Sequence, residues 1–221
     1  MRLCGICVIA LGALSSIVAD DFWIDRPLDA WSEAEIKRLV TESPWAKQVR
    51  MEAPADSPYV NRPVQVRWDS AAPIYEACAK GGMERYLFSC VSKLLYLSGL
   101  RNKYDLLRQD YYIIGVSNYP KTLSGPNLPQ HSDAANAALE QLSDRIKQTA
   151  FLKRKDKAPS KAAKVVTLPA GETPLLIVFF TRGDALSIDD EGVTFEMADR
   201  DIQLHVAFSF KSMLYKGRLE L

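Results

Sequence analysis

The sequence predicts an α+β fold in which a largely antiparallel sheet has helices packed on one side. Up to about residue 155 the apolar residues recur mostly at helical spacing, whereas from residue 164 onward they recur at every second position. Helices followed by a run of strands are typical of α+β proteins. The composition is that of a globular chain, with 48% hydrophobic and 25% charged residues among 221. It excludes disordered, collagen-like and disulfide-dense classes.

The first 19 residues predict a signal peptide rather than part of the fold. Arg2 precedes the apolar run of residues 3–14, and the small residues of 15–19 end at Ala19, directly before the expected cut. The alternative is an uncleaved membrane anchor, because residues 3–19 reach the short limit for spanning a bilayer. We therefore expect an exported protein, periplasmic or extracellular, with no stable membrane span once the signal peptide is removed.

Removal of residues 1–19 leaves a mature chain, residues 20–221, whose 27 basic and 27 acidic side chains balance. A net charge of zero provides no global field for steering onto nucleic acid, so we expect no nucleic-acid partner. The balance is an average, however, since residues 20–35 carry six acids and residues 145–164 carry eight bases. The basic stretch is either a solvated helix end or a contact with an anionic envelope surface.

The mature chain reads as a single domain with a helical N-terminal part, residues 20–155. Ser32 and Glu35 form a capping box that begins the first helix, and Ser43-Pro44 ends it. Pro73 is tolerated in the first turn of a second helix because the amides there have no intrahelical partner. The predicted helices cover residues 32–43, 73–80, 83–95 and 133–153.

Strands are predicted mainly in the C-terminal part, residues 164–221. Residues 64–68 alternate apolar and polar side chains, which predicts a half-buried strand, whereas the continuous apolar run 175–180 predicts a strand covered on both faces. Two alternating runs separated by a short polar link predict an antiparallel hairpin over 193–210. The predicted strands cover residues 64–68, 111–116, 164–168, 175–180, 193–197 and 202–210, with loops at 50–63 and 118–130.

Two cysteines, Cys78 and Cys90, remain in the mature chain. In an oxidising compartment a leftover pair indicates a disulfide. A helical hairpin folded at Gly81-Gly82 would offset the two residues by about 7 Å along the axis, and one continuous helix would separate them by about 18 Å. Both distances strain the reach of a disulfide, so the spacing favours buried free thiols and the disulfide stays as the alternative.

Three short segments resemble an uncharacterised family of exported bacterial proteins. They are the W-S-x-x-E…S-P-W-A pattern at residues 31–46, a V-x-V-x-W…S-A-x-P pattern at residues 64–73 with one residue of difference in spacing, and the G-(K/R)-L-E-L ending at residues 217–221. The resemblance implies export and a shared fold. It implies no known activity, so no catalytic residue follows from it.

Few residues of the sequence belong to a recognisable catalytic, metal-binding or phosphate-binding pattern. A catalytic zinc site would need both histidines, His131 and His205, together with a carboxylate. The acidic segment 184–191 offers oxygen ligands, but its spacing differs from a calcium-binding loop and is typical of a solvated turn. Nucleophile elbows, phosphate-binding loops and dinucleotide fingerprints are absent from the sequence. We therefore predict no catalytic residue, metal or cofactor.

Two further possibilities concern carboxylates and tryptophans. The sequence does not show which carboxylates converge, so a pair suited to glycoside hydrolysis stays open. Trp23 and Trp45 suit either core packing or stacking on a sugar, and core packing is favoured. The leading interpretation is a non-catalytic binding or assembly module in the periplasm or at the cell envelope, with an envelope component or a protein as partner. The alternatives are an exported hydrolase with a carboxylate-based site and a protein anchored by its N-terminal segment.

Overall fold

A computed structural model describes residues 21–57, 59–81, 90–91, 101–120, 132–170, 173–200 and 202–221. The predicted signal peptide or anchor at residues 1–19 lies outside the described residues. So do nearly all of the predicted helix 83–95, most of the predicted loop 118–130, and His131. Among the described helices, none combines the length and apolar character needed to cross a bilayer.

The predicted α+β class with antiparallel pairing is confirmed. The helices are α1 (Phe22–Asp25), α2 (Glu33–Thr41), α3 (Ala72–Lys80), α5 (Arg101–Asp110) and α6 (Asp133–Thr149), with short 3-10 turns η1 (Leu28–Ala30), η4 (Ile188–Asp190) and η5 (Phe210–Ser212). The strands are β1 (Ala46–Arg50), β2 (Pro63–Trp68), β3 (Tyr111–Ser117), β4 (Phe151–Lys153), β5 (Ser160–Lys161), β6 (Lys164–Ala170), β7 (Thr173–Thr181), β8 (Gly192–Asp199), β9 (Ile202–Ser209), β10 (Leu214–Tyr215) and β11 (Arg218–Leu219).

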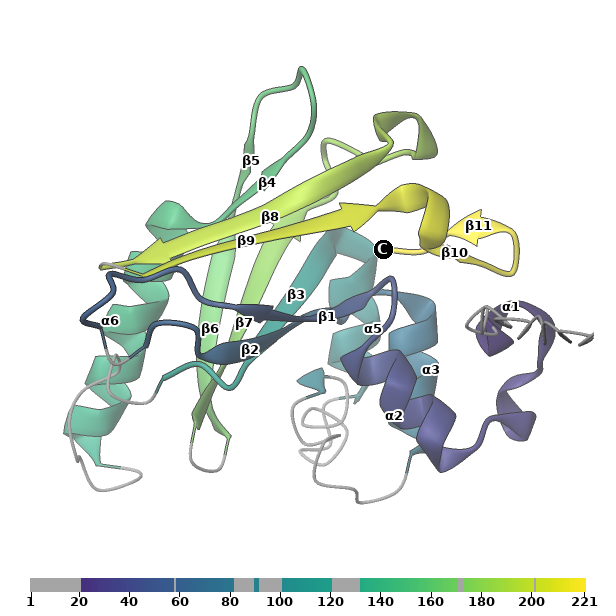
Figure 1. Cartoon of the computed structure of the whole chain (residues 1–221), viewed down its shortest axis with the longest axis horizontal. Helices are drawn as coiled ribbons and strands as arrows, with labels where there is room; N and C mark the ends of the chain where they lie inside the picture. The colour runs from purple at the N-terminus through teal and green to yellow at the C-terminus, as the bar shows by residue number, and fades with distance from the viewer. Residues whose placement is uncertain are drawn as a thin grey trace, which may run out of the picture.

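The strands divide over three sheets. One has the order β1-β2-β3-β7-β6, a second has the order β5-β4-β8-β9, and β10 and β11 form a short ribbon. Every described strand pair is antiparallel, including the predicted β8–β9 hairpin. In Figure 1 this hairpin passes across the five-stranded sheet, with α6 at one end of the molecule and α2, α3 and α5 gathered at the other.

The five-stranded sheet is covered on both faces. Along β7, Leu176, Val178 and Phe180 belong to the main core, which also holds the inner residues of β8 and β9. The alternate residues of β7 belong to a second cluster with Val91 and Tyr104. Because successive side chains of a strand point to opposite faces, the second sheet covers one face and α5 helps to cover the other. The predicted burial of this strand on both faces is confirmed.

Three local predictions differ from the structure. The last predicted helix ends at Thr149 rather than at residue 153, because residues 151–153 form β4 and pair with β8. The strand over 64–68 is buried throughout rather than half-buried, since its polar residues Gln65 and Arg67 find partners inside the protein. An edge strand, β1, was not predicted. It has little apolar alternation, ends at the first residue of the predicted loop 50–63, and pairs with residues 63–67 of β2.

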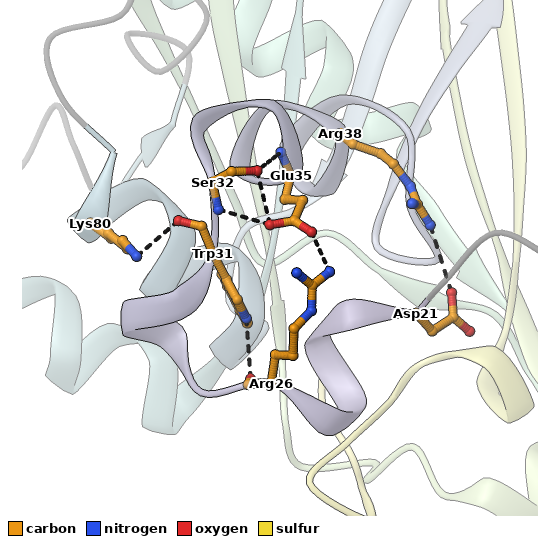
Figure 2. Close-up of polar contacts among 7 residues, drawn as sticks. All are labelled: Asp21, Arg26, Trp31, Ser32, Glu35, Arg38 and Lys80. Atoms are coloured by element: carbon orange, nitrogen blue, oxygen red, sulfur yellow. Dashed lines mark hydrogen bonds and ion pairs between the residues drawn. The ribbon is translucent and has the colours of Figure 1, made fainter.

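The capping box that begins α2 is confirmed. The Ser32 hydroxyl accepts the Glu35 amide at 3.4 Å, and the Glu35 carboxylate accepts the Ser32 amide at 2.8 Å. Figure 2 shows these reciprocal contacts at the first turn. They satisfy two amides that have no partner within the helix. This helix end is therefore specified by its own sequence.

Candidate functional site

The two cysteines are joined in the structure. Cys78 at the end of α3 and Cys90 form a disulfide, with their Cα atoms 6.3 Å apart and both side chains fully buried. The separation is smaller than the sequence spacing suggested and lies inside the range that a disulfide spans. The expectation of free thiols, drawn from that spacing, does not hold in this structure.

His205 lies on the exposed face of β9, beside a shallow cavity of about 390 Å³. Its Nδ1 is 3.5 Å from a carboxylate oxygen of Glu196, and that carboxylate also pairs with Lys153 at 2.6 Å. Glu196 is the one carboxylate among the described residues that line this cavity. Glycoside hydrolysis usually needs two, so the cavity does not assemble the predicted alternative of a carboxylate-based hydrolase.

The acidic segment 184–191 is occupied by internal ion pairs. Asp184 and Asp190 both pair with Arg154, whose side chain is almost fully buried, and Asp190 also contacts Lys157 at 2.6 Å. Among the described residues, no group of His, Cys, Asp and Glu side chains is arranged to hold a metal ion. The same pairs engage part of the basic stretch 145–164, as does Arg145 with Asp199 at 2.7 Å. This weakens the interpretation of that stretch as an envelope contact.

The acidic N-terminal stretch is also engaged internally, as Figure 2 shows. Arg26 pairs with Glu35, and Arg38 approaches Asp21 at 3.9 Å. The Lys80 ammonium donates to the carbonyls of residues 28, 29 and 31 at 2.6–2.9 Å. A lysine with three carbonyl partners is fully satisfied. This cluster fastens the N-terminal segment to α2 and α3 and offers no open site.

All four tryptophans are buried, which confirms core packing for Trp23 and Trp45. Trp23 packs edge-to-face on Trp45 with ring centroids 5.8 Å apart, and the Trp45 indole donates to the Glu220 carbonyl at 2.7 Å. Trp68 similarly packs on Phe208 of β9 at 5.4 Å. None of the four is available as a sugar platform.

A larger cavity, about 620 Å³, lies where α5, the end of β7 and the C-terminal ribbon meet. Its polar lining includes two arginines that are far apart in the sequence, Arg108 of α5 and Arg182 just after β7. The other polar groups that line it come from Ser70, Tyr112, Ser187 and Glu220. Exposed Ile188 and Leu214 line the same cavity, so one side of it is apolar.

Both arginines are held by aromatic rings and carbonyls. The Arg108 guanidinium lies 4.6 Å from the ring centre of Tyr75, and its Nε donates to the Ser70 carbonyl at 2.8 Å. The Arg182 guanidinium lies 4.2 Å from the ring centre of Tyr112. Its Nε donates to the Arg108 carbonyl at 3.0 Å and its Nη2 to the Leu221 oxygen at 2.7 Å. Stacking on a ring and donating to a carbonyl fix the orientation of a guanidinium.

The two arginines of the cavity differ in their partners, since Arg182 contacts the oxygen of Leu221, the last residue of the sequence, whereas Arg108 forms no ion pair with the described lining residues. Glu220 is the cavity's one carboxylate side chain among the described lining residues, and it lies outside ion-pair distance of Arg108 and Arg182. Burial lowers the pKa of Arg182 from its usual value, and the charge of Arg108 acts in the same direction, whereas Tyr112 and Glu220 raise it. Two cations held close together in a partly buried site attract an anion.

The described lining shows no nucleophile paired with a base. The Ser70 hydroxyl already accepts the Ile113 amide at 3.0 Å, and no histidine lines this cavity among the described residues. Nucleophilic catalysis by serine needs an adjacent base. The fold and the cavity thus define an α+β protein with a cationic, partly apolar cavity. No protein-family model matches the chain, and no characterised protein or solved structure matches it either.

The sequence carries no local signal for this cavity. Histidines, cysteines and carboxylates at characteristic spacings are the usual sequence signals of a site, whereas this cavity depends on two arginines separated by 74 positions. An arginine near the end of a helix normally interacts with the helix dipole, so Arg108 gave no signal. Leu186 and Ile188 within the acidic segment 184–191 were a local irregularity, because such a turn is normally polar throughout.

Proposed function

We propose that the protein is an exported, non-catalytic binding module that holds an anionic ligand in the cavity of Arg108 and Arg182. The observation that carries this proposal is the oriented guanidinium of Arg108, which forms no ion pair with the described residues of the cavity and lies in the same lining as the guanidinium of Arg182. The signal-peptide pattern of residues 1–19 supports export. The disulfide supports it as well, because disulfides persist mainly in oxidising compartments.

Export is tested on the full chain expressed in a bacterial host with a periplasm. N-terminal sequencing of the purified protein should begin at Asp20, and the protein should fractionate with periplasmic markers. A protein that keeps Met1 or Arg2 and sediments with membranes would instead support the anchored alternative. Reduction should add about two mass units to the exported protein, since opening one disulfide adds two hydrogens.

Anion binding is tested by thermal unfolding of the exported protein with a panel of small ligands. Carboxylates and phosphates should raise the Tm, and the rise should continue with the logarithm of ligand concentration above the Kd, because a ligand that binds only the native state stabilises it. Uncharged analogues should leave the Tm unchanged. Arg108→Gln should abolish the shift, whereas the exposed Arg50→Gln should keep it. If no anion in the panel raises the Tm at millimolar concentration, the proposed function is wrong.

Fewer contacts support the alternative function, an exported hydrolase. It rests on the contact between His205 and Glu196 beside the smaller cavity. Both side chains lie on an open sheet surface, where water screens their charges. Nothing in the described part of that cavity supplies a second carboxylate, so binding is the better supported function.

A further inference from the structure

The cavity of Arg108 and Arg182 has a second property that anion binding alone does not explain. Five large apolar side chains of the described residues are notably exposed, and two of them, Ile188 and Leu214, line this one cavity. Ile188 is 43% exposed and Leu214 is 36% exposed. Leu186 and Leu219 lie in the same lining. Apolar side chains gathered around a concave site indicate a ligand with apolar surface.

The two kinds of surface meet within one cavity. Arg108 and Arg182 come from α5 and from the end of β7, whereas the apolar residues come from the turn around η4 and from the C-terminal ribbon. A simple inorganic anion would contact only the first set. A purely apolar ligand would leave the terminal nitrogens of Arg108 without a partner among the described residues, which is costly once water is displaced.

The partners of the two arginines favour a single anionic head group. Arg108, Arg182 and Glu220 line the cavity, and so does Leu221, the last residue of the sequence, whose oxygen accepts from the Arg182 Nη2 at 2.7 Å. Arg182 already donates to two main-chain oxygens, at Arg108 and at Leu221. Arg108 uses only its Nε among the described residues, so its two terminal nitrogens form a free edge. That edge matches the two oxygens of a carboxylate.

We propose that the ligand of this cavity is a small amphiphilic carboxylate, with its head group on Arg108 and its apolar chain against Ile188 and Leu214. This inference rests on the proposed function, because it names the class of anion bound. Arg182 adds positive charge and fixes the backbone of Arg108. The cavity volume of about 620 Å³ suits a molecule of moderate size, because small-molecule sites usually measure about 300–1,000 Å³.

Calorimetric titration of the exported protein with four probes tests the proposal. Octanoate has both parts of the ligand, acetate has only the head group, octanol has the chain with an uncharged head, and octyl phosphate has the chain with a more highly charged head. Octanoate should bind at least about 10-fold more tightly than each of the other three, because each comparison removes or mismatches one set of contacts.

Substitutions of lining residues test whether octanoate binds in this cavity. Arg108→Gln should weaken octanoate binding about 10-fold or more and leave the weak binding of octanol unchanged. Ile188→Ser and Leu214→Ser should weaken octanoate binding several-fold without changing the binding of acetate. Arg50→Gln is the matched control, as it removes an exposed arginine far from the cavity lining. Ile188 is exposed, so its replacement tests the proposal even if Arg108→Gln fails to fold.

The outcomes separate this inference from the proposed function. Equal affinity for acetate and octanoate would overturn the amphiphile while anion binding stands. Tighter binding of octyl phosphate would overturn the carboxylate head group. Tight octanoate binding that survives both Arg108→Gln and Ile188→Ser would place the site elsewhere and overturn the inference. Failure of all four probes, together with failure of the anion panel, would overturn both.

Discussion

Arg67 and Asp69 form an ion pair that is removed from water on every side. The Arg67 Nε lies 2.6 Å from the Asp69 carboxylate, and their side chains are 2% and 1% exposed. The Asp69 carbonyl also accepts the Tyr104 hydroxyl at 2.6 Å. The space for the carboxylate exists because residue 115 is glycine, since a Cβ there would lie 2.1 Å from the Asp69 Oδ2. Burial raises the pKa of Asp69, and Arg67 opposes this change.

Replacing Arg67 by methionine should therefore lower the free energy of unfolding by about 3–5 kcal/mol at pH 7, because Asp69 would be left buried without its cation. The loss should shrink as the pH falls. The folded pKa of Asp69 is raised above its unfolded value, so its contribution to stability is fully present below the unfolded pKa. That contribution is lost as the pH rises through the folded pKa.

Urea unfolding at pH 4 and at pH 7 measures this difference. The exposed Arg50→Met provides the control and should change little at either pH. The double variant of Arg67→Met with Asp69→Asn should regain much of the stability lost at pH 7. A loss for Arg67→Met that stays constant with pH would contradict the assigned role of Asp69.

At the scale of single elements, the sequence predicted those features that depend on neighbouring residues. The start of α2 was predictable because the groups that satisfy its first amides lie three residues apart. The length of α6 was not, because Lys153 and the rest of β4 pair with β8, about 40 residues away. The burial of β2 was also unpredictable, since Gln65 bonds to the Thr41 carbonyl and Arg67 to a residue after the strand.

The capping box of α2 should produce a measurable dependence of stability on pH. The backbone amide of Ser32 lowers the pKa of Glu35, and the Ser32 hydroxyl and Arg26 contribute in the same direction. A lowered folded pKa means that the stabilisation is present above the unfolded pKa of about 4.3 and is lost as the pH falls through the folded value.

Glu35→Gln should therefore cost about 0.3–1 kcal/mol at pH 7, the typical contribution of a charge at a helix N-terminus. The difference from the parent protein should vanish near pH 2.5. Glu33→Gln removes an acid from the same turn, outside the capping box, and should show a smaller pH-dependent difference. Equal pH dependence for the two variants would show that the box itself contributes nothing.

At the scale of the whole molecule, the N-terminal helices and the C-terminal strands share one core. Trp68 of β2 packs against Phe208 of β9, and Trp45 bonds to the Glu220 carbonyl. The sequence predicted a single domain and its class. It did not predict that the strands divide into separate sheets, because that division depends on which strands pair. Nor could it predict the cavity, whose two arginines meet only after α5 and β7 pack together.

A shared core should make the exported protein unfold in one cooperative step. All four tryptophans lie in the first third of the chain, whereas most strand residues lie in the last third. Urea transitions followed by tryptophan fluorescence and by far-UV circular dichroism should therefore coincide. Two separated midpoints would contradict the single domain and indicate that the helical and strand-rich parts fold independently.

The disulfide between Cys78 and Cys90 has a consequence for the integrity of the chain outside a cell. It closes a covalent ring from residue 78 to residue 90. A protease that cuts one peptide bond within this ring leaves both fragments joined through the sulfur atoms. The nicked protein would migrate as an intact chain under non-reducing conditions and separate into two pieces only after reduction. The bridge thus protects the protein from losing either half after a single cut at that point.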